Sequence, residues 1–145
     1  MLEVELKAGD IFAWQNYPLF MKEFKSQRWL LFLGCNSVQA IVYQISTTTQ
    51  YRHYIEDGGR TRHNYFKIPA GMGGLTVESI LDFYFFEYVH EALLNQCKAE
   101  IKKTGSLNQD NINRFIKCLK KDTHISKIIK RDISGYLSDA GFKVA

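Results

Sequence analysis

The first half of the chain alternates short apolar runs with clusters of turn residues. β-Branched and aromatic side chains dominate these runs, which is typical of strands. The predicted strands are residues 11–14, 28–34, 38–46, 65–68 and 78–85. Five or so short strands at such close spacing favour a small barrel over a parallel sheet.

Turn residues separate the predicted strands. The tetrapeptide 34–37 is a hairpin-like connection, and Asp57-Gly58-Gly59 is a strong turn signal inside the long polar stretch 47–64. The glycine-rich segment 69–75 has neither the GK[ST] of a P-loop nor the spacing of a dinucleotide fingerprint, and it precedes a strand. We therefore expect a turn with positive φ there rather than a phosphate cradle.

Beyond about residue 85 the apolar residues recur at helical spacing, and three helices are predicted. The first rests on Phe86, Val89, Leu93, Leu94, Cys97 and Ile101, with Gly105 as its stop. The second rests on Ile112, Phe115, Ile116 and Leu119, with Ser106 or Asn108 as its cap. The third rests on Ile125, Ile128, Ile129 and Ile133, with Asp122 or Thr123 as its cap. Each helix has one apolar face, which must pack on the barrel or on a second subunit.

The chain is therefore expected to be mainly β with α: one domain over 1–145, with barrel strands and loops in 1–85 and a helical part in 86–145. A length of 145 residues and an apolar share of 46% suffice for one core and argue against global disorder. The longest apolar run, 29–33, is far too short for a membrane span, and no secretory signal is visible. Three widely spaced cysteines disfavour a disulfide framework. These features predict a cytoplasmic protein without a membrane partner.

The net charge of +4 is unevenly distributed. Residues 1–90 carry 8 Lys and Arg against 9 Asp and Glu, whereas residues 91–145 carry 11 against 6. A basic C-terminal third could bind a polyanion or an acidic segment of a partner protein. The alternative is that its charges lie on helix faces exposed to solvent.

Metal and cofactor motifs are missing from the sequence. The four histidines never fall at metal-ligand spacing, and neither HExxH nor CxxC occurs. No GxSxG is present either. We expect no metal and no cofactor.

Polar and basic residues gather around the third strand and the stretch after it. They are Ser46, Thr47, Thr48, Thr49, Gln50, Arg52, His53, Arg60, Arg62 and His63, with Arg28 at the start of the second strand. Guanidinium groups can hold a phosphate and neutralise charge on phosphorus, and nearby aromatic rings can stack unpaired bases. The alternative is a polar strand end followed by solvated arginines.

The chain resembles the MazF/PemK-type toxins, the small ribonucleases of bacterial toxin–antitoxin pairs. Four stretches carry the resemblance, in the family's order: KAGDIF (7–12), RWLLFLG (28–34), AIVYQIST (40–47) and FKIPAGMGGLTVESIL (66–81). They are similar to the family's "R-G-D-I" strand, its arginine followed by an apolar strand, its "V-x-V-x-P-I-T-S" strand, and its "I-x-A" and Gly-Leu segment. The match covers about the first 90 residues.

That resemblance implies an SH3-like (MazF/CcdB-type) barrel with appended helices, a homodimer, and an antitoxin protein as partner. It also implies metal-independent cleavage of single-stranded RNA, in which the ribose 2′-OH attacks the adjacent phosphorus. Arg28 matches the family's catalytic arginine. Ser46 matches its catalytic threonine in an ungapped alignment, and Thr47 matches it if the register slips by one. The residues expected to bind RNA are Trp14, Gln15, Thr48, Gln50, Arg52, His53, Arg60 and Arg62.

Several departures from the family keep other functions open. Trp29 replaces the usual proline, the 47–64 stretch is longer than typical, and the segment after residue 85 is aromatic. One alternative is a non-catalytic toxin of the same fold that binds a protein such as DNA gyrase, as CcdB-type toxins do. Another is an inactive barrel that binds RNA or a peptide.

Overall fold

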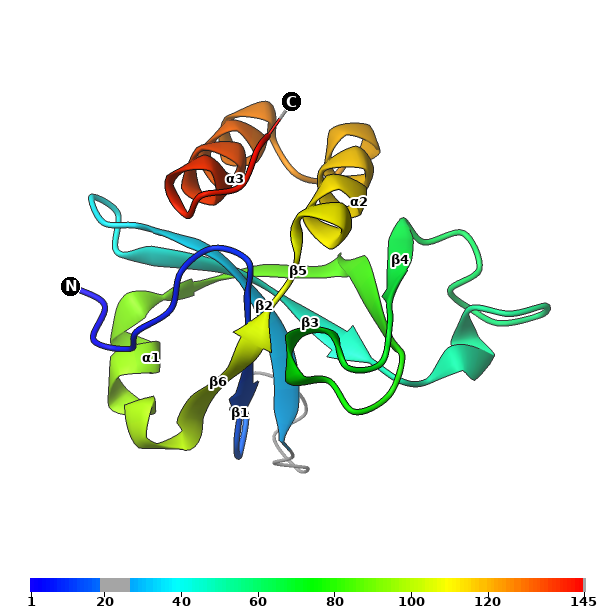
Figure 1. Ribbon diagram of the computed structural model, residues 1–145, viewed down its shortest axis with the longest axis horizontal. Coiled ribbons are helices and arrows are strands. Elements are labelled where there is room, and N and C mark those ends of the chain that lie inside the picture. Colours follow the sequence, from blue (N-terminus) through cyan, green and yellow to red (C-terminus); the bar gives the residue numbers. More distant parts are fainter. Residues whose placement is uncertain (19–26, 145) are drawn as a thin grey trace.

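Six antiparallel strands form one curled sheet, which carries the helices on its faces (Figure 1). The computed structural model describes residues 1–18 and 27–144. Its strands are β1 (Asp10–Trp14), β2 (Arg28–Asn36), β3 (Ile41–Thr48), β4 (Tyr65–Ile68), β5 (Ser79–His90) and β6 (Ile101–Ser106). Its α-helices are α1 (Glu91–Gln96), α2 (Gln109–Lys121) and α3 (Lys127–Asp139). The expectation of a mainly β protein with helices is confirmed, and the curled sheet is compatible with a small barrel.

The strand order is β4-β5-β3-β2-β1-β6, and the glycine-rich loop 69–75 bridges its two ends. The Thr104 hydroxyl on β6 donates to the carbonyl oxygen of Gly73 at 2.7 Å. Gly73 has φ +63°, and a Cβ there would lie 2.5 Å from Cγ1 of Ile11. The predicted positive-φ turn is thus confirmed, because only glycine lets this loop approach β1 and β6 so closely.

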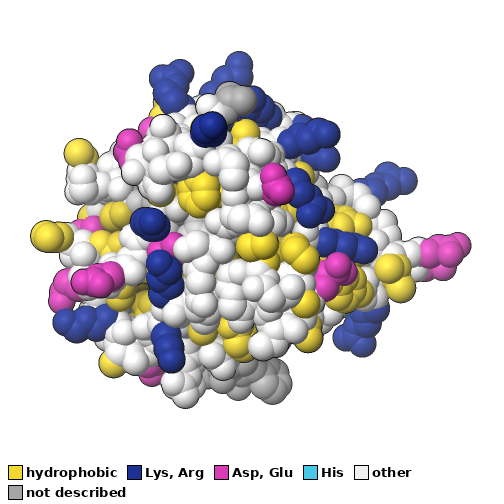
Figure 2. Space-filling view, viewed as in Figure 1, with side chains coloured by type: hydrophobic (Ala, Val, Ile, Leu, Met, Phe, Trp, Pro, Cys, Tyr) yellow, Lys and Arg dark blue, Asp and Glu magenta, His cyan; other side chains and the backbone are white. Residues whose placement is uncertain are grey.

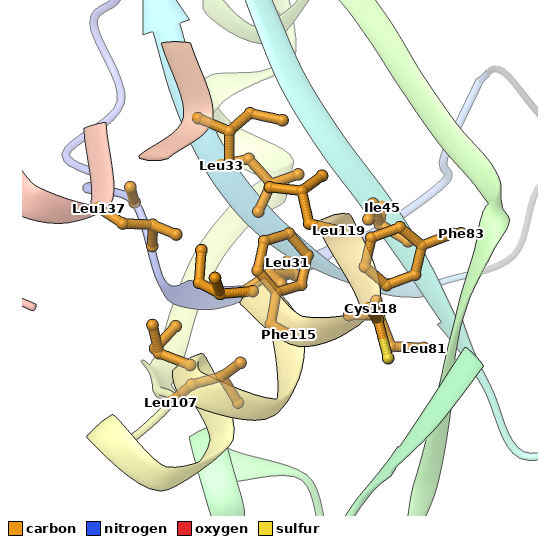
Figure 3. Close-up of a cluster of buried hydrophobic side chains, with 14 of the residues drawn as sticks. Leu31, Leu33, Ile45, Leu81, Phe83, Leu107, Phe115, Cys118, Leu119 and Leu137 are labelled. Atoms are coloured by element: carbon orange, nitrogen blue, oxygen red, sulfur yellow. The ribbon is translucent and has the colours of Figure 1, made fainter. Parts of the chain in front are cut away.

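Helices α2 and α3 cover one face of the sheet. Their outer surfaces are basic, and Figure 2 shows Lys and Arg side chains gathered over the two helices. Their inner surfaces pack on the strands, with Phe115, Leu119 and Leu137 buried (Figure 3). The sheet contributes Leu31 and Leu33 of β2 to this cluster. The amphipathic pattern of the last two helices therefore reflects packing on this chain's own sheet.

The opposite face of the sheet carries a second apolar cluster. Phe12, Trp14, Leu30 and Phe32 pack there with Leu94 of α1. Alternate side chains of a strand point to opposite faces, so β2 is buried on both. This explains why its sequence is a continuous apolar run rather than an alternating one.

The first helix predicted after residue 85 is confirmed only over its middle part. Strand β5 continues to His90, α1 covers only Glu91–Gln96, and residues 101–106 form the edge strand β6 paired with β1. The aromatic run at 83–86 fits a strand as well as a helix, and pairing with β3 decides the outcome. The helical part therefore does not begin at residue 86, because residues 86–90 and 101–106 belong to the sheet.

The two later helices are confirmed, although one cap differs from the prediction. The side chain of Asn108 caps α2 by accepting a hydrogen bond from the backbone N–H of Asn111. Helix α3 is capped by Ser126, not by Asp122 or Thr123. The Asp122 carboxylate instead accepts from the backbone N–H groups of His124 and Ile125 at 2.9 Å, which fixes the turn before α3.

Candidate functional site

The ends of β2 and β3 bring the predicted catalytic residues together. Leu30 pairs with Ser46 in the antiparallel register, so Arg28, two residues before Leu30, lies beside the last residues of β3. Two adjoining pockets of 190 and 70 Å³ open here and share Arg28, Thr47, Thr48 and Gln50. We call these two pockets the Arg28 site. Its polar predicted residues are Arg28, Ser46, Thr47, Thr48, Gln50 and Arg60.

Arg28 begins strand β2 and is half-buried. Burial lowers the pKa of its guanidinium from the ordinary value. A partly desolvated cation interacts more strongly with a phosphate than a fully hydrated one. Arg28 can therefore hold a phosphate and neutralise charge that develops on it.

Ser46 and Thr47 differ in what their hydroxyl groups contact. The Thr47 hydroxyl donates to the backbone carbonyl of Trp29 at 2.9 Å, and Thr47 is buried. Ser46 lies on the sheet face that also carries Arg28, and no hydrogen bond of its hydroxyl occurs among the described residues. Of the two alternatives, Ser46 has the hydroxyl available to a ligand.

The long polar stretch folds back and adds a second guanidinium to the Arg28 site. Arg60 stacks over the ring of Phe85 at 4.8 Å and lies 5.7 Å from the ring centre of Tyr54. Its guanidinium donates to the Tyr54 hydroxyl at 3.4 Å. Two arginines from distant segments, Arg28 and Arg60, therefore line the smaller pocket.

Trp14, predicted to stack on RNA bases, is fully buried in the second apolar cluster. It packs edge-on against Tyr17 with ring centres 5.0 Å apart. The ring presents no exposed face on which a base could stack. The Trp14 side chain instead stabilises the core. The prediction for Trp14 is wrong. In the sequence, an aromatic residue at a strand end is equally compatible with base stacking and with core packing, and only its burial distinguishes the two.

Four other predicted RNA-binding residues lie outside the Arg28 site. Gln15 is exposed just beyond β1, and its backbone N–H donates to Glu100. Arg52 and His53 lie on a 3₁₀ turn, η1 (Tyr51–His53), where His53 contacts the Gln50 side chain at 3.1 Å. Desolvation, followed by the nearby charges of Arg60 and Arg52, lowers the pKa of His53. Arg62 faces a different pocket.

That different pocket, which we call the His63 pocket, has a volume of 330 Å³. Its chemically active lining residues are Arg62, His63, Tyr84, Lys121, Asp122 and His124. Beneath it Asp82, fully buried on β5, contacts His63 Nδ1 at 2.6 Å and accepts from the Tyr54 hydroxyl at 2.7 Å. In the sequence, Asp82 inside an apolar strand is the signal for this site. A charge is rarely buried without partners, so such an aspartate indicates a polar cluster around it.

Within residues 1–18 and 27–144, no three His, Cys, Asp or Glu side chains converge as a metal site would require. No helix in the same part of the chain is long and apolar enough to cross a membrane. No protein-family model matches the chain. No curated protein matches its sequence.

Proposed function

We propose that this chain is a metal-independent endoribonuclease that binds single-stranded RNA at the Arg28 site. The observation that supports this function is the convergence of Arg28, Ser46, Thr48, Gln50 and Arg60 on two adjoining pockets. These residues come from separate stretches of sequence. The resemblance to MazF/PemK-type toxins assigns Arg28 and Ser46 to catalysis, and the polar composition of the cluster leads us to expect Thr48, Gln50 and Arg60 to bind RNA. The fold we propose is the SH3-like barrel of those toxins.

The chemistry of the site suits a phosphodiester. Arg28 and Arg60 supply two guanidiniums, which form charge-assisted hydrogen bonds to phosphate oxygens. The same groups stabilise the extra negative charge that develops when a nucleophile adds to phosphorus. The Ser46 hydroxyl can donate to a third phosphate oxygen.

The nucleophile in this proposal comes from the substrate. The ribose 2′-oxygen attacks the adjacent phosphorus, the bond to the 5′-oxygen breaks, and the strand ends in a 2′,3′-cyclic phosphate. DNA has no 2′-hydroxyl and is therefore not cleaved. Single-stranded RNA is favoured because its bases and backbone can adapt to a short groove.

The test is incubation of the full chain with a long unstructured RNA in EDTA, followed by analysis of the product ends. We expect discrete fragments with cyclic phosphate ends. Arg28→Ala should lower kcat/KM by about 100- to 1000-fold, the usual effect of losing one transition-state donor. Arg28→Lys should restore only part of the activity, because lysine cannot form the bidentate contact.

Lys102→Ala is the matched control, since Lys102 is an exposed cation on the edge strand β6 and lies outside both sites. Its cleavage rate should equal that of the wild type. Intact RNA after incubation with a folded wild-type chain would refute the nuclease proposal. It would favour a non-catalytic toxin or an inactive RNA- or peptide-binding barrel.

The resemblance also leads us to propose an antitoxin partner and a homodimer. The basic outer face of α2 and α3 would suit an acidic antitoxin segment. Light scattering after size-exclusion chromatography tests the dimer directly, since a mass near 34 kDa is twice the chain mass of 16.8 kDa.

A further inference from the structure

The ring of His63 is held in one orientation by three neighbours. Its Nδ1 lies 2.6 Å from Oδ2 of Asp82, its face stacks on Tyr84 at 4.8 Å, and Tyr54 meets it edge-on at 6.5 Å. A carboxylate only accepts hydrogen bonds, so Nδ1 is the nitrogen that donates to Asp82, and Nε2 is left for a ligand. No hydrogen bond to Nε2 occurs among the described residues, and His63 lines the His63 pocket.

The pair of His63 and Asp82 is stabilised from beneath. Asp82 is fully buried, and its second oxygen accepts from the backbone N–H of Tyr84 at 2.9 Å. Burial and the hydrogen bond to Asp82 raise the pKa of Tyr54 to about 12, so Tyr54 remains a donor to the carboxylate at neutral pH. The Asp82 carboxylate therefore contacts His63, Tyr54 and the backbone of Tyr84, and these contacts fix the orientation of His63. A buried carboxylate that fixes the tautomer of a half-exposed histidine is an arrangement suited to proton transfer.

We propose that His63 is the general base of RNA cleavage, an inference that rests on the proposed ribonuclease function. The Arg28 site supplies guanidiniums and hydroxyls, and none of its lining side chains has an ordinary pKa near neutral pH. The His63 pocket supplies two imidazoles. The substrate class is a single-stranded RNA whose scissile phosphate lies where the His63 pocket adjoins the Arg28 site.

The proton transfers balance within this pocket. Nε2 of His63 takes the proton of the 2′-hydroxyl as the bond from the 2′-oxygen to phosphorus forms. The bond from phosphorus to the 5′-oxygen breaks, and the 5′-oxygen takes a proton from the protonated ring of His124. Arg28 and Arg60 neutralise charge on the scissile phosphate, and Lys121 and Arg62 contact phosphates of the flanking nucleotides. The products are a 2′,3′-cyclic phosphate and a 5′-hydroxyl.

The two sites adjoin along the bend of β5. Tyr84 lines the His63 pocket and Phe85 lines the Arg28 site, and their ring centres lie 5.6 Å apart. Arg60, in the Arg28 site, contacts the Tyr54 hydroxyl that binds Asp82. In this proposal the scissile phosphate contacts groups of both sites, and the flanking nucleotides extend into each of them. Tyr84 is 72% exposed and offers a ring for base stacking.

The charged and titratable groups around His63 come from four segments: Tyr54 and Arg62 of the long loop, Asp82 and Tyr84 of β5, Lys121 of α2, and Asp122 and His124 of the turn before α3. Asp122 is the one carboxylate that lines the pocket. Its Oδ2 accepts from the backbone N–H groups of His124 and Ile125, and its Oδ1 accepts from the Asn64 side-chain amide at 3.4 Å. Besides His63, the other residues that line the pocket are Arg62, Asn64, Tyr84, Lys121, Thr123 and His124, none of which is acidic.

The principal test is His63→Asn, measured with a fluorogenic RNA oligonucleotide in EDTA. The asparagine amide replaces Nδ1 and keeps a donor for Asp82, while the group at Nε2 is lost. We expect kcat to fall by about 100-fold or more with little change in KM, the usual contribution of a general base. His90→Asn, at an exposed histidine that caps α1, is the matched control and should behave as the wild type.

The leaving-group role of His124 has a separate readout. His124→Ala should slow cleavage of RNA but leave cleavage of uridine 3′-(4-nitrophenyl phosphate) almost unchanged, because nitrophenolate leaves without a proton. His63→Asn should slow both reactions. Equal loss on both substrates in His124→Ala would contradict its role as the acid.

The outcomes separate this inference from the proposed function. Cleavage by the wild type together with an unchanged kcat in His63→Asn would overturn the role of His63 and leave the ribonuclease standing. No cleavage by the folded wild type would refute both. If His63→Asn does not fold, NMR of the wild type with an oligonucleotide bearing one 2′-deoxyuridine decides the question. The His63 Cε1–H resonance should then shift on binding, and an unmoved resonance overturns the inference.

Discussion

Glu87 on β5 carries a carboxyl group in a mostly apolar setting. Burial raises its pKa from 4.5 to about 7. The carboxyl accepts from the Gln44 amide at 2.8 Å and from the Tyr17 hydroxyl. Between pH 4.5 and 7 the folded chain keeps a proton that the unfolded chain has lost, so stability falls as pH rises through that window.

Glu87→Gln should remove this pH dependence, because the amide stays neutral and can still accept from Tyr17 and Gln44. Relative to the wild type, the free energy of unfolding of Glu87→Gln should rise by about 2 kcal/mol between pH 4.5 and pH 7, allowing for partial exposure of the group. Urea unfolding at several pH values measures it. Glu5→Gln, at an exposed position, should show no such trend. Parallel pH profiles for Glu87→Gln and the wild type would contradict the assignment.

At the scale of elements, the loop 69–75 decides whether the curled sheet closes. Gly73→Ala should destabilise the fold by about 2 kcal/mol or more, because φ is positive and a Cβ would lie 2.5 Å from Ile11. Gly59→Ala is the matched control, since nothing lies within 4 Å of its Cβ position and its φ is not positive. Thermal unfolding compares the two variants. A Gly73→Ala chain as stable as Gly59→Ala would show that the loop can move away from β1 without cost.

Some predicted elements depend on neighbouring residues in the sequence, and others depend on pairing with distant strands. Helix α2 follows from its apolar spacing and from Asn108, both local, and Asn108 is one of the two caps that the sequence predicts. Residues 86–106 have apolar residues at helical spacing too, yet only 91–96 form an α-helix, whereas 86–90 belong to β5 and 101–106 form β6. Pairing with β3 and β1 overrides the helical pattern there, and such pairing joins residues far apart in sequence.

At the scale of the whole molecule, the cations of the two sites should make RNA binding sensitive to salt. If Arg28, Arg60, Arg62 and Lys121 each contact a phosphate, the slope of log affinity against log salt concentration should be about −3. A 2′-O-methyl oligouridine, which cannot be cleaved, allows the measurement by fluorescence anisotropy. Arg62→Ala should make the slope less steep by about 0.7, and Lys102→Ala should leave it unchanged. A slope near zero would exclude phosphate contacts by these residues.

Taken by itself, the sequence determined the strand-rich first half, the glycine turn and the last two helices. These depend on local properties: β-branched runs, positive φ at glycine and apolar spacing with a cap. It also selected Arg28, Ser46, Thr48, Gln50 and Arg60, which do line one site. The exposure of an aromatic or polar residue is not a local property, because it depends on what packs against that residue. For this reason the sequence prediction placed Trp14 wrongly.

Only the tertiary structure decided how the long loop and the bend of β5 meet. Four residues, 82–85, lie opposite the single residue Ser46 at the register shift between β3 and β5. That bend directs Asp82 toward His63, 19 positions earlier, and lines the pocket with Lys121 and His124 from the end of α2 and the turn after it. No local pattern encodes such a meeting, because it depends on where the sheet curls and on which helix end covers it.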